Sequence, residues 1–549
     1  MVSLPFCNSA YGDMNQTKRD WIASLTEEYP LTPFDKIAPV GYFSQVYGFA
    51  HSEWDADFRS GMAILIAERL KVVIARFPFL GGQLILSDGQ QEGSKLIYSR
   101  DLGSANISQG PNPLDTLYPC YVASEMLRFN VSNLKGHRLE NDPRNESNLP
   151  FVTMAGLKAC RHEGTVHPNF IHDTARATHY KNGHYLHPLI LQATFLEDGL
   201  VLGFSAHHSV MDLTALTDVI AHFADPTTAA PFDLDAHLTR AHTLLSTPSN
   251  TPLNPLTDIA SYSFDKYPDL LPPATGGKVP LLLTIPHAFL QPLHVHCDEL
   301  VRQWDIPGGF VSRVDVISGL IWVVLTAARL RAWPTRLEPN GTVVGLESGA
   351  PSRFCTAVNV RGRLAGGAAY PGNAFVRVVT RADITIGSIV GADKIPVFED
   401  VAHAALLIRN ALRGMDKEWE GHVKMARMAV GLEAGGGRFV ARPRDVGDAV
   451  ARATERDAAG VDFSVNVTMG ADILFDLPGL PSPMAAPGTK VRPDFVRFPL
   501  DRVGGCVRLL PRVGGTQGAE DWEVLAPVRP QEVDFVLAEF QRLVGLQFA

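Results

Sequence analysis

Two apolar runs in the first half of the chain are separated by an acidic turn that contains glycine. Residues 189–195 and 200–204 flank Glu197-Asp198-Gly199, an order typical of two antiparallel strands joined tightly. After Asp212 the apolar spacing becomes helical, with Leu213, Leu216, Val219, Ile220 and Phe223 on one side. The pattern therefore predicts a buried strand, a short loop that ends at residue 212, and a helix.

The spacing of apolar residues typical of strands, and that typical of helices, predict further elements in both halves of the chain. A helical stripe over residues 57–77 stops at Pro78, and a glycine pair then leads into a strand over 83–86. Ser312 is expected to cap an apolar helix that runs to about residue 330, and a last helix covers 530–543. Strands are predicted at residues 279–285, 356–359, 374–379, 462–468, 506–510 and 522–526. Strands and helices alternate without a repeat, which favours an α/β architecture in two parts.

The predicted parts are separated by a stretch rich in proline, threonine, aspartate and serine. It covers residues 224–278 and includes the breakers Asp225-Pro226 and Pro272-Pro273. We therefore expect an N-terminal domain over 1–223, a crossover linker over 224–278 and a C-terminal domain over 279–549. A length of 549 residues agrees with two large domains, since domains commonly have about 100 to 200 residues.

Composition narrows the function classes. Apolar residues make up 46% and charged residues 19%, which is typical of large buried cores. The net charge of −9 and the lack of a long basic run argue against a basic surface that would bind nucleic acid or an anionic membrane. Six scattered cysteines without a C-x-x-C pair, and no signal segment at residues 1–13, predict a cytoplasmic protein. We expect a monomer.

Candidate chemistry is concentrated at the end of the predicted strand, where residues 203–212 read GFSAHHSVMD. A histidine there can act as a base near neutral pH, and an aspartate at a helix start is favoured by the exposed amides. Polar residues at the edge of a hydrophobic core, without any catalytic role, would explain the same pattern.

Two other patterns in the sequence resemble catalytic or metal-binding motifs. Ser205 follows Gly203 as in a nucleophile elbow, but the second glycine is missing. His294, His296 and Cys297 fall in an alternating pattern that predicts the surface of a strand, and the histidines between residues 162 and 187 lack ligand spacing. No metal site is predicted.

Several motifs, in order along nearly the whole chain, resemble the BAHD acyltransferases, in particular the fungal branch of trichothecene 3-O-acetyltransferase-like enzymes. Residues 31–35 (LTPFD) resemble the family's opening strand, and residues 76–82 (RFPFLGG) its first helix end. The strand pair leads into HHSVMD at 207–212, which is similar to the H-x-x-x-D signature. SRVD at 312–315, RGR at 361–363 and YPGNA at 370–374 match the second half.

The resemblance implies two chloramphenicol-acetyltransferase-like domains, each a mixed sheet with helices. It implies transfer of an acyl group from acyl-CoA, most simply acetyl-CoA, to a hydroxyl of a bulky secondary metabolite. His208 would be the general base of a direct ternary-complex transfer, in a tunnel that CoA and the acceptor enter from opposite faces. Asp212 would turn away from the histidine and pair with an arginine, which the motif match assigns to Arg313.

The resemblance also suggests groups for the oxyanion and the cofactor. The oxyanion candidates are Asn466 and Thr468, which precede the region of the family's D-F-G-W-G motif. The cofactor-binding candidates are Arg361, Arg363, Asn373, Arg492 and Arg497. Partners are the acceptor and the CoA thioester, with no metal.

The chain departs from the family in two places. Leu213 follows Asp212 where many members have glycine. The D-F-G-W-G motif is reduced to FDLPG at 475–479, followed by an insertion over 480–490. Two alternatives therefore remain open: a condensation-type enzyme with a carrier-tethered donor, and a non-transferring member that binds or cyclises a metabolite.

Overall fold

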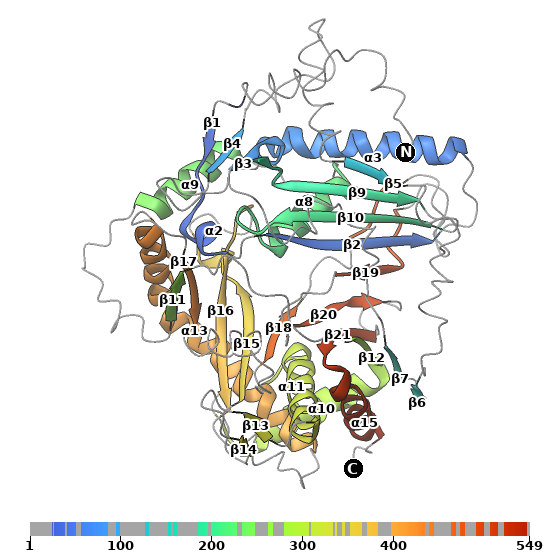
Figure 1. Ribbon diagram of the computed structural model, residues 1–549. Coiled ribbons are helices and arrows are strands. Elements are labelled where there is room, and N and C mark those ends of the chain that lie inside the picture. Colours follow the sequence, from blue (N-terminus) through green and yellow to red (C-terminus); the bar gives the residue numbers. More distant parts are fainter. Residues whose placement is uncertain are drawn as a thin grey trace, which may run out of the picture.

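A computed structural model gives the architecture of the protein, which is built around two large β-sheets (Figure 1). It describes residues 25, 27–38, 41–50, 56–85, 95–98, 127–130, 152–154, 157–161, 185–195, 199–227, 233–246, 262–266, 279–306, 309–332, 335–337, 343–345, 352–364, 370–382, 397–433, 439–443, 463–467, 473–477, 490–498, 506–513 and 521–545. The mixed α/β class predicted from the alternating periods is confirmed.

The first large sheet carries the predicted strand pair in its interior. Its order is β19 (Phe495–Arg497), β2 (Tyr42–Ala50), β10 (Gly199–His207), β9 (Leu189–Phe195) and β5 (Leu127–Asn130). β10 is antiparallel to both neighbours and buried along its whole length. Helices α3 (Ala56–Arg76) and α8 (Leu213–Ala224) contribute to the core of this sheet. The predicted strand–loop–helix unit is therefore confirmed.

A smaller sheet lies beside the first one. Its order is β1 (Glu27–Tyr29), β4 (Lys95–Tyr98), β3 (Gln83–Ile85) and β8 (Tyr185–Leu186), and the short helix η1 (Pro78–Gly81) leads into β3. The chain reaches η1 because Pro78 ends α3, as the sequence predicts.

The second large sheet has eight strands and lies in the lower part of Figure 1. Its order is β16 (Phe375–Ala382), β15 (Ser352–Asn359), β18 (Phe463–Val467), β20 (Cys506–Val513), β21 (Asp521–Val528), β12 (Val279–Ile285), β7 (Leu157–Arg161) and β6 (Val152–Met154). Its core includes residues of α10 (His287–Gln303), α11 (Arg313–Ala332), α13 (Phe398–Glu433) and α15 (Val533–Gly545), which follows η5 (Pro530–Glu532). The predicted cap is present, because Ser312 Oγ accepts from the Asp315 amide at 3.3 Å.

One prediction in this half is wrong. His294, His296 and Cys297 do not lie on a strand surface but in helix α10. The helical spacing of Phe289, Leu290, Leu293, Cys297 and Val301, all buried, explains the helix. His294 Nε2 lies 2.9 Å from the Val311 carbonyl oxygen, a local structural contact.

The two large sheets exchange strands. β6 and β7 precede the predicted crossover yet join the second sheet, whereas β19 follows it and joins the first. The crossover itself contains helix α9 (Leu234–Ser246) and strand β11 (Tyr262–Lys266), which pairs with β17 (Phe439–Pro443). β13 (Thr335–Leu337) and β14 (Val343–Gly345) form a separate hairpin. The domain boundaries remain a prediction, and the two parts interlock across them.

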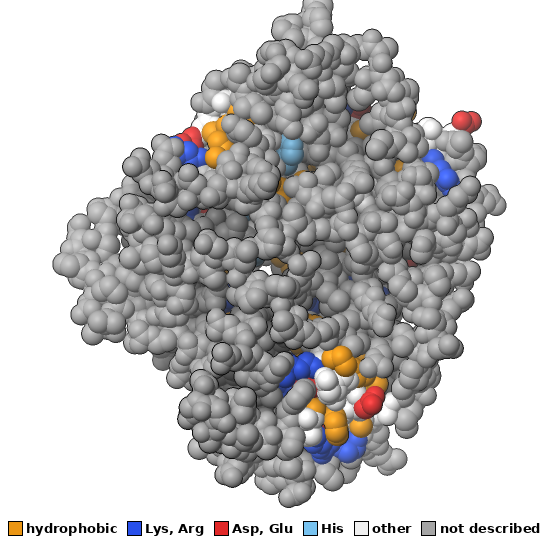
Figure 2. All heavy atoms as spheres, viewed as in Figure 1, with side chains coloured by type: hydrophobic (Ala, Val, Ile, Leu, Met, Phe, Trp, Pro, Cys, Tyr) orange, Lys and Arg blue, Asp and Glu red, His pale blue; other side chains and the backbone are white. Residues whose placement is uncertain are grey.

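The surface in this view has mixed character. Apolar, basic and acidic side chains lie beside one another over the region of α10, α11 and α15 (Figure 2). Among the helices built of described residues, none combines the length and the apolarity needed to cross a bilayer. In the described part of the chain, His, Cys, Asp and Glu side chains form no group of three suited to a metal ion.

Candidate active site

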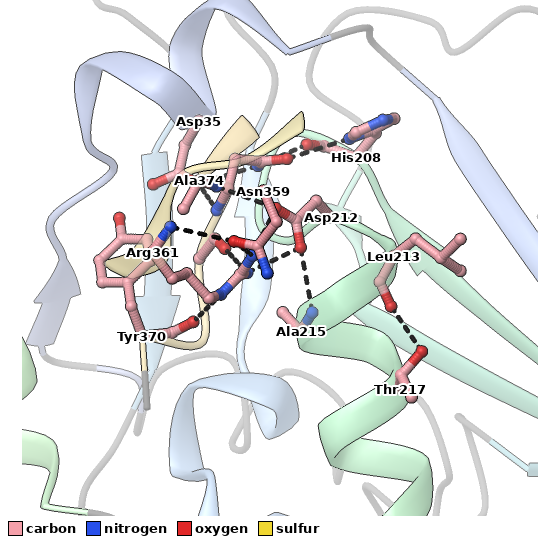
Figure 3. A network of polar contacts seen from close by, with 12 residues as sticks. Asp35, His208, Asp212, Leu213, Ala215, Thr217, Asn359, Arg361, Tyr370 and Ala374 are labelled. Atoms are coloured by element: carbon pink, nitrogen blue, oxygen red, sulfur yellow. Dashed lines mark hydrogen bonds and ion pairs between the residues drawn. The ribbon is translucent and has the colours of Figure 1, made fainter. Parts of the chain in front are cut away.

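The loop between β10 and α8 holds His208 and Asp212 in a fixed main-chain path. The His208 amide donates to the Gly41 carbonyl oxygen at 2.8 Å, and the His207 amide donates to Pro188 at 2.9 Å. Gly41 has a φ of +137°, which favours glycine over any side chain. Asp212 is the N-cap of α8, because its Oδ1 accepts from the Ala215 amide at 3.0 Å (Figure 3).

Asp212 forms a buried, bidentate ion pair with Arg361. Arg361 Nη1 lies 3.0 Å from Oδ2, and Nη2 lies 2.7 Å from Oδ1 (Figure 3). The remaining Arg361 donors reach the carbonyl oxygens of Tyr370 at 2.8 Å and Gly372 at 2.6 Å. The Ala374 amide also donates to Asp212, at 2.9 Å. The pair thus joins the start of α8 to the loop that precedes β16.

The assignment of Arg313 as the partner of Asp212 is therefore wrong. Arg313 is the first residue of α11, and its Nη2 donates to Gln291 of α10 at 2.6 Å. Arg361 comes directly after β15, and β15 pairs with β16 so that its end lies beside the loop at 370–374. The predicted link between the two halves exists, and the arginine of the RGR segment makes it.

Asn373 fixes the orientation of the His208 imidazole. Its side-chain Nδ2 donates to the His208 carbonyl oxygen at 2.7 Å and to an Asp35 carboxylate oxygen at 2.8 Å. Both partners only accept, so the amide oxygen of Asn373 must face His208 Nδ1, 3.1 Å away. That oxygen accepts a hydrogen bond from Nδ1–H, which leaves Nε2 as the unprotonated nitrogen. The contacts therefore select the tautomer that has a basic Nε2.

The surroundings of His208 keep the ring neutral. Phe43 and Phe375 flank it, with ring centroids 4.9 and 5.5 Å away. Burial lowers the pKa of His208 from the ordinary value of 6.5, and Arg377 of β16 adds to the lowering, although Asp212 and the Asn373 contact oppose it. A lowered pKa means that the neutral, basic form persists to a lower pH than for an exposed histidine.

His207 has a packing role, as expected from the sequence. Its side chain is buried, its ring meets Tyr42 edge-on at 5.1 Å, and its Nδ1 accepts from the Ser209 amide at 3.3 Å. It therefore supports the loop that carries His208.

Asp35 is a further residue of the site, and the sequence indicated it only as part of the LTPFD motif. Asp35 contacts Asn373 and lies in the short helix α2 (Pro33–Ile37), where a family strand was expected. Thr32 and Asp35 form a capping box, and Pro33 occupies the first turn. Thr-Pro-x-Asp is itself a helix-start signal, so the sequence does contain the information.

Two of the four arginines predicted for the cofactor have carboxylate partners within the protein. Arg361 pairs with Asp212, and the polar groups of Asn373, the remaining candidate, contact His208 and Asp35. Arg497 in β19 forms a bidentate pair with Glu523 of β21, at 2.6 and 3.2 Å. Arg363 and Arg492 are exposed and remain predicted phosphate contacts. For the oxyanion candidates, Asn466 lies in β18, paired in register with Arg508, and Thr468 lies outside the described residues.

The reduced FDLPG segment has a clear packing role. Phe475 is buried and contacts the rings of Tyr47 and Phe49, at 5.2 and 5.0 Å. Asp476 accepts from Arg69 of α3 at 2.7 Å. Phe475 also pairs with Val491, so the described residues on the two sides of the insertion lie next to each other.

Replacement of Phe475 by alanine should lower the free energy of unfolding by about 3–5 kcal/mol, because it opens a cavity between two aromatic rings. Chemical denaturation monitored by circular dichroism measures the change. Leu474→Ala is the matched control, since Leu474 is 42% exposed, and it should change stability by no more than about 0.5 kcal/mol. Equal effects of the two substitutions would contradict the packing role.

Comparison with known proteins identifies the family of the chain. The model of the Transferase family matches residues 152–440, more than half of the chain. The chain is 27% identical over 278 residues to the O-acetyltransferase astG of Aspergillus oryzae, covering 42% of this chain and 56% of that protein. It is 25% identical over 351 residues to the O-acetyltransferase andG of Emericella variicolor, covering 61% and 62%.

Among solved structures, the fold resembles that of F. sporotrichioides TRI101 in complex with coenzyme A and T-2. The TM-score is 0.61 at 16% identity, and the alignment covers 94% of this chain and 98% of the other. The alignments with the curated relatives span only about 40 to 62% of those proteins' length. The family match covers more than half of the chain, so the protein belongs to the BAHD-type Transferase family.

Proposed function

We propose that this protein is a CoA-dependent O-acyltransferase, most simply an O-acetyltransferase, that acts on a hydroxyl group of a bulky secondary metabolite. The observation that carries the proposal is the Asn373–His208 contact, which leaves a basic nitrogen at the end of a buried strand. The names of the relatives, which are O-acetyltransferases, support the reaction class.

His208 supplies the proton transfer that such a reaction needs. Its Nε2 removes the proton of the acceptor hydroxyl as the oxygen attacks the thioester carbonyl carbon. The same proton then passes from Nε2 to the departing sulfur when the carbon–sulfur bond breaks. Throughout, Asn373 accepts from Nδ1 and steadies the ring, and Asp212 and Arg361 hold the loop without entering the proton transfer.

The side chains around His208 fit an uncharged acyl thioester and an apolar acceptor. Two phenyl rings, Phe43 and Phe375, flank the imidazole, and apolar walls also exclude water from the reacting atoms. Acyl-CoA supplies the acyl group as a thioester. Arg363 and Arg492 are the exposed cations that we propose for its phosphates.

The pH dependence of kcat/KM should have its acidic limb below pH 6.5, because the pKa of His208 is lowered from that value. Arg377→Gln removes a cation that disfavours the imidazolium, so the pKa of His208 should rise and the limb should move to higher pH. Initial rates between pH 4.5 and 9 measure both curves. An unmoved limb in this variant would exclude His208 as the group that titrates.

Calorimetric titration with acetyl-CoA and with CoA tests the donor directly. Binding of both is expected, and no binding at millimolar ligand would overturn the proposal. A panel of acyl-CoAs with a metabolite extract, read by mass shift, then identifies the acyl length and the acceptor. Transfer only from a carrier-bound thioester would favour a condensation-type enzyme instead.

A further inference from the structure

Asp35 is a buried carboxylate, and in the described part of the chain its oxygens accept four hydrogen bonds. The Thr32 amide and hydroxyl donate to Oδ2 at 2.8 and 2.7 Å. The Asn373 amide and side-chain Nδ2 donate to Oδ1, both at 2.8 Å. Asp35 is 1% exposed. An amide in its place would direct its NH₂ group at two other donors whichever way it turned.

Packing holds helix α2 against the second half of the chain. Phe34 stacks on Trp419 of α13 at 6.3 Å and belongs to a core cluster with residues of β16. The Tyr370 hydroxyl donates to Thr32 Oγ1 at 3.0 Å. The helix and the loop at 370–374 therefore form one rigid unit, and a capping box alone does not explain why its acid also binds Asn373.

We propose that Asp35 is a positioning residue for the reaction: in its ionised form it orients the Asn373 amide, and through it leaves Nε2 of His208 as the free base. This inference rests on the proposed function. The chain of contacts runs from Asp35 Oδ1 to Asn373 Nδ2, and from Asn373 Oδ1 to His208 Nδ1. Asp35 does not touch the reacting atoms, so it acts only through Asn373.

The consequence of losing the carboxylate follows from the donors and acceptors. If residue 35 presented an N–H or O–H group to Asn373, the amide would lose one of the two acceptors that fix its orientation, and only the His208 carbonyl oxygen would still accept from Nδ2. The turned-over amide would then become populated, and in it Nδ2 faces His208 Nδ1 and donates to it. The imidazole proton would move to Nε2, and the base would be lost.

The pKa of Asp35 agrees with a switchable contact. Burial raises it from 3.8 to about 6, although the hydrogen bonds from Asn373 and Thr32 lower it. Because the pKa is raised, the carboxyl gains a proton as the pH falls through 6. The titratable groups that face it are Tyr29 and Tyr370, whose pKa values are raised by burial, so both are neutral at this pH. His237 of α9 stacks on the Tyr29 ring at 5.4 Å and lies tilted against the Tyr370 ring at 5.0 Å.

The test compares Asp35→Asn with Asp315→Asn. Asp315 is also buried and forms the same capping contacts, with Ser312 at 2.7 and 2.6 Å, but it lies in α11 and pairs with Arg409. Two quantities are measured: kcat with acetyl-CoA, and the rate at which diethyl pyrocarbonate modifies His208, followed by peptide mass spectrometry. The second measurement does not depend on transferase activity.

Asp35→Asn should lower kcat by about 10- to 100-fold and slow the modification of His208, with the Kd for acetyl-CoA unchanged within about twofold. Asp315→Asn should alter neither rate. A wild-type modification rate in Asp35→Asn would overturn the inference. Full activity of His208→Ala would overturn the proposed function instead, and the modification rates would still decide the role of Asp35.

If Asp35→Asn does not fold, the pH dependence of His208 modification in the wild-type protein tests the role of Asp35 instead. Modification of His208 should fall with decreasing pH more steeply than a single ionisation allows, because Asp35 gains a proton near pH 6 and the pKa of His208 is itself lowered from 6.5. Asn373→Ala cuts the connection and should give a single-ionisation curve. A single-ionisation curve in the wild type would exclude the role of Asp35.

Discussion

Replacement of His208 by alanine should reduce the rate of acyl transfer by about 10³-fold, the largest effect of any single substitution on activity. The Asn373 amide oxygen accepts from Nδ1–H of the His208 ring, and this contact leaves Nε2 as the basic nitrogen. In the proposed mechanism, loss of the ring removes both the base that deprotonates the acceptor and the acid that protonates the leaving sulfur. Steady-state kcat with acetyl-CoA measures the effect, and calorimetry should show an unchanged Kd for acetyl-CoA.

The control for this substitution is His294→Ala. His294 is half-buried, as His208 is, but it lies in α10, where its Nε2 contacts the Val311 carbonyl oxygen at 2.9 Å. Its replacement should leave kcat within about twofold. Turnover retained by His208→Ala would rule out the proposed base, whereas an equal loss in both variants would indicate a folding effect.

The sequence predicted the central elements of the fold because their signals are local. The turn before Gly199 and the change of period after Asp212 predicted β9, β10 and α8. Helix α10 was missed because His294-Val-His296-Cys297 alternates over four residues, while its buried stripe repeats over a longer span. The exchange of β7 and β19 between sheets is a long-range pairing, which no local period records.

The same difference between local and long-range signals explains which site residues the sequence could predict. His208 and Asp212 lie in one loop, so the local sequence was sufficient to place them at a strand end and a helix start. The partner of Asp212 is 149 positions away in sequence, and the matched motifs in the second half contain three arginines, Arg313, Arg361 and Arg363. Only the pairing of β15 with β16 decides that Arg361, rather than Arg313, reaches the carboxylate.

Disruption of the Asp212–Arg361 pair should cause a large loss of stability. Arg361→Met should lower the free energy of unfolding by about 3–5 kcal/mol, because it leaves the Asp212 carboxylate buried without its charge partner. It also removes donors to the carbonyl oxygens of Tyr370 and Gly372, so the loop that carries Asn373 loses its support. The rate should therefore fall with stability.

Arg313→Met is the matched control, since Arg313 is the arginine that the motif favoured and it contacts Gln291 instead. It should change the free energy of unfolding by less than about 1 kcal/mol and leave kcat unaltered. Urea denaturation of both variants, with Asp212→Asn and the double variant Asp212→Asn/Arg361→Met, completes a cycle. The double variant should be more stable than the sum of the single losses predicts, because no charge is then buried alone. Additive losses would mean that the two side chains do not act as a pair.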